Sequence, residues 1–276
     1  MSRRLALALS LAAAPLATAL PLDVRAEDRV SRPRDVPAAF SRVRVAGPFD
    51  VTVREGSPAA VVVQAAPSDQ EKVKVELKGD ALVVGSTERW TWGETPKVAV
   101  AVTLPELRGL EVSGSGEARA ETGPAARDLG LTVGGSGSIA WKGTAAALAI
   151  AVSGSGDVQA EGPAQRLEVH LSGSGDVGYA GKSGPAKVAI SGSGNVKLAG
   201  EGESLDASTS GSGDVEAKDF AVRDAKVAIA GSGDASLRLT GGSLTVRIAG
   251  SGDVVWTGEA KGVDARTSGS GSVSRR

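Results

Sequence analysis

Apolar and polar residues alternate over short stretches that recur along the second half of the chain. One stretch, Ala151 to Gly162, is AVSGSGDVQAEG, and the next two copies are HLSGSGDVGYAG and AISGSGNVKLAG. In most copies apolar residues stand two, four and six residues before the first glycine of the Gly-Ser-Gly phrase, and four and six residues after it. A period of two predicts β-strands with one buried face, and the spacing of an amphipathic helix is absent.

The Gly-Ser-Gly phrase repeats at a nearly fixed interval, which is the signature of a solenoid. Nine copies occur, spaced 19 to 21 residues apart, and they begin at Gly114, Gly135, Gly154, Gly173, Gly192, Gly211, Gly231, Gly250 and Gly269. About twenty residues hold two or three short strands and no helix. The sequence therefore predicts an all-β fold, a β-solenoid with about nine regular coils over residues 111–276, stacked about 4.8 Å apart.

Each phrase is predicted to form a sharp corner between two strands. Both glycines are present in every copy, and glycine accepts the positive φ and the close backbone approach that a repeated corner needs. Three residues after the first glycine, the side chain is Asp, Glu, Asn or Ser in every copy. These residue types hydrogen-bond local backbone in turns.

Residues 40–110 carry a looser version of the same pattern. The stretch from Val43 to Val53 aligns with a repeat, with Gly47 as the first glycine and Asp50 three residues later, and Lys72 to Val84 resembles a further degenerate copy. We therefore expect irregular N-terminal coils that belong to the same body. These coils would also cover the terminal core, which a solenoid otherwise exposes.

The first 26 residues have the composition of an export signal. Arginines near the start precede the apolar run LALALSLAAAPLATAL, and small residues favour cleavage after Ala26 or after Ala19. Residues 27–39 are polar and contain proline, which favours a flexible leader before a domain at 40–276. No other segment could span a membrane as a helix, so we expect an exported protein of the periplasm or the cell surface.

Composition excludes several classes of site. The chain has no cysteine, which rules out disulfides and thiolate-bound metals, and one histidine, His170, at an outward strand position. A net charge of −1 provides no basic field, so no nucleic-acid partner is expected. A glycine-rich phosphate loop is excluded because a strand, and not a helix, follows every phrase.

Two sets of residues are candidates for binding. Acidic side chains at one corner position would stack about 5 Å apart, and a cation would relieve their repulsion. This pattern favours either simple turn capping or a weak calcium site at Asp157, Asp176, Asp214, Asp234 and Asp253, and no other cofactor is expected. Trp90 and Trp92 lie outside the regular repeats, where they would either bind a sugar or partner or cover the end of the core.

No catalytic constellation is evident in the sequence. Paired carboxylates arise only because the repeat stacks them, whereas an active site should interrupt the repeat. We therefore expect that the protein is not an enzyme. A polysaccharide lyase or hydrolase on a β-helix scaffold is the alternative.

The order of three motifs resembles that of a known family. The motifs are FSRVRVAGPFDVTVREG near the start, VAVTLPELRGLEVSGSG in the middle, and the GSGD or GSGN corners that follow. Together, from Phe40 to the C-terminus, they are similar to the head GIN domain family, also called auto-transporter adhesin head domains. The resemblance implies an exported bacterial protein with a right-handed, single-stranded β-helix, and it implies no established activity.

These observations favour an exported, non-enzymatic binding module of the cell envelope. Flat, stacked faces with rows of Ser, Asp, Arg and Lys suit a repetitive ligand, so the expected partner is a glycan, an envelope polymer or a protein. An assembly protein that joins rods end to end through uncapped strands is a further alternative. The sequence leaves the oligomeric state open.

Overall fold

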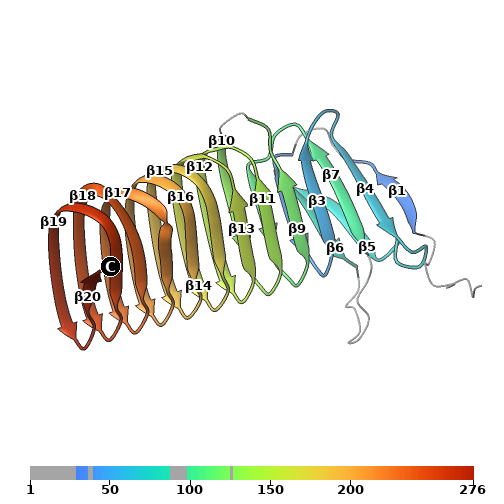
Figure 1. Cartoon of the computed structure of the whole chain (residues 1–276). Helices are drawn as coiled ribbons and strands as arrows, with labels where there is room; N and C mark the ends of the chain where they lie inside the picture. The colour runs from blue at the N-terminus through green and yellow to red at the C-terminus, as the bar shows by residue number, and fades with distance from the viewer. Residues whose placement is uncertain (1–28, 37–39, 88–97, 125–126) are drawn as a thin grey trace, which may run out of the picture.

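The chain forms one elongated array of stacked β-strands (Figure 1). The structure, a computed structural model, describes residues 29–36, 40–87, 98–124 and 127–276. These residues contain no helix, and their strands build a β-solenoid of about nine turns. The predicted all-β solenoid is thus confirmed, whereas the predicted export signal at 1–26 lies outside the described residues.

All strands belong to one continuous sheet, and each coil of the regular array contributes to two opposed faces of it, which are called the two sheets below. In the first coils the segments before and after each Gly-Ser-Gly corner are separate strands. They are β8 (Gly109–Val112), β9 (Glu117–Glu121), β10 (Arg127–Val133), β11 (Ser138–Lys142), β12 (Ala145–Gly154), β13 (Asp157–Glu161) and β14 (Ala164–Gly173). Further along, one bent strand runs from corner to corner, giving β15 (Val177–Gly192), β16 (Val196–Gly211), β17 (Val215–Gly231), β18 (Ala235–Gly250) and β19 (Val254–Gly269), followed by β20 (Val273–Arg275). Strands of successive coils pair in parallel, so that Val169 lies beside Val188, and Val188 beside Ala207.

The first coil follows the predicted alignment of Gly47 with the repeat. Its strands β2 (Arg42–Ala46) and β3 (Asp50–Glu55) pair in parallel with β8 and β9. On their other side lie β6 (Ala81–Ser86) and β7 (Ala99–Leu104), also parallel. The N-terminal part therefore continues both sheets of the regular array.

Three antiparallel strands close the N-terminal end. They are β1 (Val30–Arg34), which pairs with β4, β4 (Ala60–Ala65), which pairs with β7, and β5 (Val73–Lys78), which pairs with β6. Lys72 to Val84, expected as a degenerate coil, thus forms an antiparallel hairpin, and residues 30–34 of the expected flexible leader form a strand. Alternation could not reveal this difference, because parallel and antiparallel strands share the same period of two.

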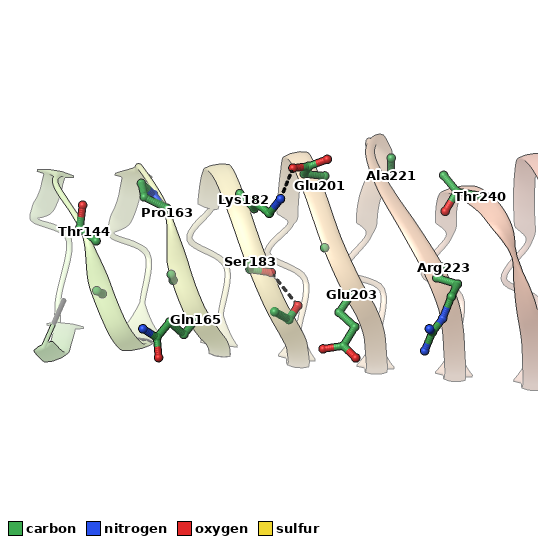
Figure 2. A pocket seen from close by; sticks show the side chains of 14 residues that line it. Thr144, Pro163, Gln165, Lys182, Ser183, Glu201, Glu203, Ala221, Arg223 and Thr240 are labelled. Carbon is green, nitrogen blue, oxygen red and sulfur yellow. Dashed lines mark hydrogen bonds and ion pairs between the residues drawn. The ribbon is translucent and has the colours of Figure 1, made fainter. Parts of the chain in front are cut away.

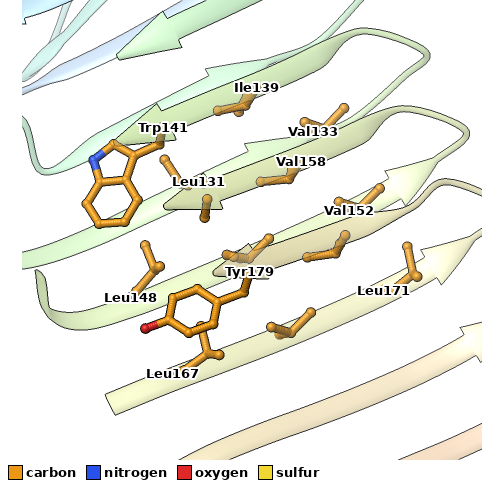
Figure 3. Packing of buried hydrophobic residues seen from close by; sticks show 14 of the residues in the cluster. Leu131, Val133, Ile139, Trp141, Leu148, Val152, Val158, Leu167, Leu171 and Tyr179 are labelled. Atoms are coloured by element: carbon orange, nitrogen blue, oxygen red, sulfur yellow. The ribbon is translucent and has the colours of Figure 1, made fainter. Parts of the chain in front are cut away.

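The core is a layer of aliphatic side chains between the two sheets (Figure 3). The inward positions predicted from alternation are buried in every coil before the last, including the aromatic residues Trp141, Tyr179 and Trp256. Trp141 donates its Nε1 hydrogen to Thr122 Oγ1 at 3.2 Å, and the Tyr179 hydroxyl donates to the Lys182 carbonyl at 2.9 Å. Both rings therefore pack in the core without leaving a polar atom unpaired.

The Gly-Ser-Gly corners stack directly on one another. Gly154 has a φ of 130°, and a Cβ on it would lie 2.5 Å from the carbonyl oxygen of Gly135 in the preceding coil. A Cβ on Gly156 would lie 2.2 Å from the carbonyl oxygen of Gly137. Both glycines of the phrase are therefore required by the close approach of successive coils, as the sequence predicts.

Candidate functional site

The residues predicted for binding fall into two groups with different outcomes. Trp90 and Trp92 lie outside the described residues, so their role as a sugar platform or as a core cover stays a prediction. The acidic corner residues Asp157, Asp176, Asp214, Asp234 and Asp253 form a single column along the array, on the exposed side of the corners.

The corner column is a ladder of hydrogen bonds between coils. Asp157 Oδ1 accepts the backbone N–H of Asp176 at 2.9 Å, and Asp214 Oδ1 accepts that of Asp234 at 2.7 Å. Asn195 fits the same ladder, since its Oδ1 accepts the N–H of Asp214 at 3.1 Å. The donor is the backbone N–H of the equivalent residue in the next coil, and not an N–H of the side chain's own turn. Stacking of the coils brings this N–H within reach of each side chain.

This ladder engages one oxygen of each carboxylate. No group of three or more metal-ligating side chains occurs among the described residues. The ladder explains why the position accepts Asp and Asn alike, since each offers an oxygen acceptor. A weak calcium site on the column stays a prediction that only binding measurements can test.

Hydrogen bonding at two carboxylates of the array lowers their pKa. The hydroxyl and the backbone N–H of Ser272 lower the pKa of Asp253. At Asp224, chiefly the backbone N–H of Ser243, then Arg223 and the Ser243 hydroxyl, lower the pKa to about 2. Both groups are therefore ionised at neutral pH, where each accepts hydrogen bonds from its serine partner in the next coil.

A groove runs along the rod axis on the side opposite the corners, where the variable turns lie (Figure 2). Its floor is one column of small residues that pair from coil to coil, namely Ala145, Ala164, Ser183 and Gly202. A Cβ on Gly202 would lie 2.6 Å from the buried ring of Phe220, so this position must stay free of a side chain. The groove has a volume of about 690 Å³.

Polar and charged side chains form the two rims of the groove. One rim carries Thr144, Pro163, Lys182, Glu201, Ala221 and Thr240, and the other carries Gln165, Glu203 and Arg223 (Figure 2). Lys182 Nζ and Glu201 Oε1 form an ion pair at 2.8 Å, and this contact raises the pKa of Lys182. Arg223 Nε pairs with Asp224 Oδ2 at 2.7 Å.

The groove has features that suit the binding of an extended ligand. Its rims offer donors and acceptors on successive coils, while its floor is smooth and largely apolar. Three of its charged side chains, Lys182, Glu201 and Arg223, are held in ion pairs. His170 lies elsewhere, exposed on a strand as predicted, with its Nε2 2.9 Å from Glu168 Oε1.

The sequence contained a signal for this groove that alternation did not reveal. The floor residues stand nine positions before the first glycine of their corners, and they are Ala, Ala, Ser and Gly in four consecutive coils. A run of small residues in one column of a solenoid indicates a hollow along that column. The signal was missed because these positions lie in the variable turns.

Comparison with known proteins identifies related folds. A family model described as "Putative auto-transporter adhesin, head GIN domain" matches residues 39–184 and 181–260. No curated protein matches the chain in sequence.

Three solved structures share the architecture. A "putative adhesin" from Parabacteroides merdae is 18% identical, with a TM-score of 0.66 over 90% of this chain and 96% of its own. A "putative adhesin" from Parabacteroides distasonis is 20% identical, with a TM-score of 0.70 over 90% and 97%. A "putative lipid binding protein" from the same species is 18% identical, with a TM-score of 0.62 over 90% and 97%. At these identities the similarity shows the fold alone.

Proposed function

Because the chain belongs to the head GIN domain family, we propose that it is an exported, non-enzymatic, adhesin-like module that binds an extended polymer along the groove. The observation that carries the proposal is the continuous floor from Ala145 to Gly202, which crosses four coils. An elongated ligand along the rod axis meets similar groups on each coil it crosses. The family's adhesin description and the predicted export signal support a place in the periplasm or at the cell surface.

A glycan or another envelope polymer is the first ligand to test. The rims present hydroxyl, amide, ammonium and carboxylate groups, which suit the dense hydrogen bonding of a sugar chain. None of the described residues that line the groove is aromatic. Stacking on a sugar ring would therefore need Trp90 or Trp92, which makes their contribution a separate question for the experiment.

A lipid is the second candidate, and the apolar floor favours it. Ala145 and Ala164 lie almost fully buried at the base of the groove and leave no polar side chain there that would oppose the acyl chain of a lipid. One structural neighbour is described as a lipid binding protein. A lipid would bind through the floor, so changes at the charged rim should affect it less than they affect a glycan.

The proposal is tested by binding of the purified protein to an array of bacterial and host glycans, with and without calcium. We expect saturable binding that Ala221→Trp abolishes, because a large side chain on this rim would fill the groove. Lys182→Ala should weaken binding. Lys226→Ala is the matched control, since Lys226 forms a comparable exposed pair with Asp206, at 3.6 Å, away from the groove.

The outcomes of this assay distinguish the tryptophans, the corner column and the groove as binding sites. Loss of binding in Trp90→Ala or Trp92→Ala would support the predicted sugar platform, and binding only with calcium would support a cation on the corner column. Equal binding by Ala221→Trp and the unaltered protein would exclude the groove as the site. Release of a shortened glycan during the assay would favour the enzyme alternative.

A further inference from the structure

The two ends of the solenoid differ in how their edge strands are protected. At the N-terminal end, β1 contains Pro33 between Arg32 and Arg34, and β5 carries Lys74 and Lys78. Proline and charged residues on an edge strand prevent another strand from pairing with it. The N-terminal end is therefore closed to further stacking.

At the C-terminal end of the described residues, part of one strand edge is unpaired. β19 pairs with β18 along its length, whereas β20 covers β19 only over Val254 to Trp256. Arg275 extends this cover through the cation–π contact of its guanidinium with the Trp256 ring, at 5.1 Å from the ring centroid. Beyond Gly258, no strand among the described residues pairs with the outer edge of β19.

The exposed part of β19 retains the residues of a buried coil. Val263, Ala265 and Thr267 occupy the inward positions and lie beside Leu244, Val246 and Ile248 of the preceding coil. Those three neighbours are at most 3% exposed, whereas Val263 is 47% exposed. The equivalent residues of β16, which are Leu205, Ala207 and Thr209, are of the same kind and are buried.

The outward residues of this edge are complementary to a second copy of themselves. Asp264 and Arg266 flank Ala265, with opposite charges and exposed side chains. In an antiparallel pair centred on Ala265, a two-fold axis places Asp264 opposite Arg266 of the partner subunit, and Val263 opposite Thr267 of the partner subunit. Inward residues then face inward in both copies, and the charges attract in both pairs.

We propose that two copies of this chain dock end to end through residues 261–269 of β19, in an antiparallel, two-fold arrangement centred on Ala265. The partner is a second copy because the charge pattern of the edge is self-complementary. The assembly stops at two copies because Pro33 and the charged residues of β1 and β5 close the outer ends. The shared edge is short, so we expect weak, concentration-dependent association.

Sedimentation velocity of the purified protein from roughly 1 µM to 1 mM tests this arrangement. We expect a monomer at the low end of the range and a dimer at the high end. Arg266→Asp places two aspartates opposite each other across the axis and should weaken the dimer at least about tenfold. Lys226→Asp is the matched control, since it makes the same charge change on the same face, away from the edge.

Two charge-swap experiments distinguish loss of the proposed pairing from loss of folding. The double variant Asp264→Arg with Arg266→Asp restores opposite charges across the axis and should dimerise like the unaltered protein. An equimolar mixture of the single variants Arg266→Asp and Asp264→Arg should form mixed dimers at concentrations where each variant alone is mostly monomeric. A monomer at every concentration, growth beyond two copies, or failure of both exchanges to restore the dimer would overturn the proposal.

Discussion

Asp234 Oδ1 accepts a hydrogen bond of 2.7 Å from the backbone N–H of Asp253, which occupies the same position one coil further along. Asp253 Oδ1 in turn accepts the N–H of Ser272 at 2.8 Å. From Asp157 onward, a side chain at each corner thus satisfies a backbone donor of the next corner. This relationship makes the residue after Gly-Ser-Gly a connector between coils, whether or not the column also binds a cation.

The connector role predicts different effects for two substitutions of Asp234. Asp234→Ala leaves the N–H of Asp253 without its acceptor and should lower the free energy of unfolding by about 1 kcal/mol. Asp234→Asn keeps an oxygen acceptor, as Asn195 does naturally, and should change it by less than about 0.5 kcal/mol. Urea denaturation measures both values. Equal destabilisation by the two variants would show that charge, and not the acceptor, matters.

Acid should remove the contribution of Asp224. Its folded-state pKa of about 2 lies below the usual value of 3.8, so its stabilising effect is complete above about pH 4 and is lost as the pH falls toward 2. Asp224→Asn should therefore lower the urea midpoint at pH 7. The two midpoints should converge below about pH 2, where both side chains are neutral. A difference that stays constant down to that pH would contradict this linkage.

The stacked corners predict that alanine substitution lowers stability at one glycine of the corner region and not at another. Gly154→Ala combines a φ of 130° with a Cβ 2.5 Å from a carbonyl oxygen, and should destabilise the protein by about 3 kcal/mol or more. Gly134→Ala is the control, because nothing lies within 4 Å of its Cβ position. Ala230 and Ala249 occupy that position in later coils, so the control should change stability by less than about 0.5 kcal/mol. Thermal unfolding followed by circular dichroism distinguishes the two variants.

The regular coils were predictable because each one repeats the same local rule. Alternation identifies Val188 and Ile190 as inward residues, and the fixed spacing places them beside their equivalents in the next coil. Once the period is known, register and core follow without further assumptions. The export signal and the two tryptophans stay predictions, since they lie outside the described residues.

The groove and the N-terminal cap depend on features that alternation does not encode. The floor at Ser183 and Gly202 is set by the path of the variable turns, which differ in sequence from coil to coil. The direction of β4 and β5 is set by pairing with β7 and β6, and either direction fits the same alternating pattern. Non-local contacts decide both features.

Tyr179 provides a direct probe of the core, because it is the only tyrosine of the chain. Burial between the sheets raises its pKa to about 12, from a usual value of 10. The folded state therefore favours the neutral phenol, whose hydroxyl donates to the Lys182 carbonyl at 2.9 Å. Stability linked to this group is complete below about pH 10 and declines as the pH rises toward 12.

Absorbance of the phenolate during alkaline titration measures this pKa without interference from another tyrosine. We expect a midpoint near 12 in the folded protein and near 10 in concentrated urea, where water reaches the hydroxyl. Tyr179→Phe should abolish the signal, which assigns it to this ring. A midpoint near 10 while circular dichroism still shows the folded sheet would mean that water enters the core beside Lys182. The floor of the groove, which Ser183 forms next to Lys182, would then be an open and mobile surface rather than the firm one proposed for polymer binding.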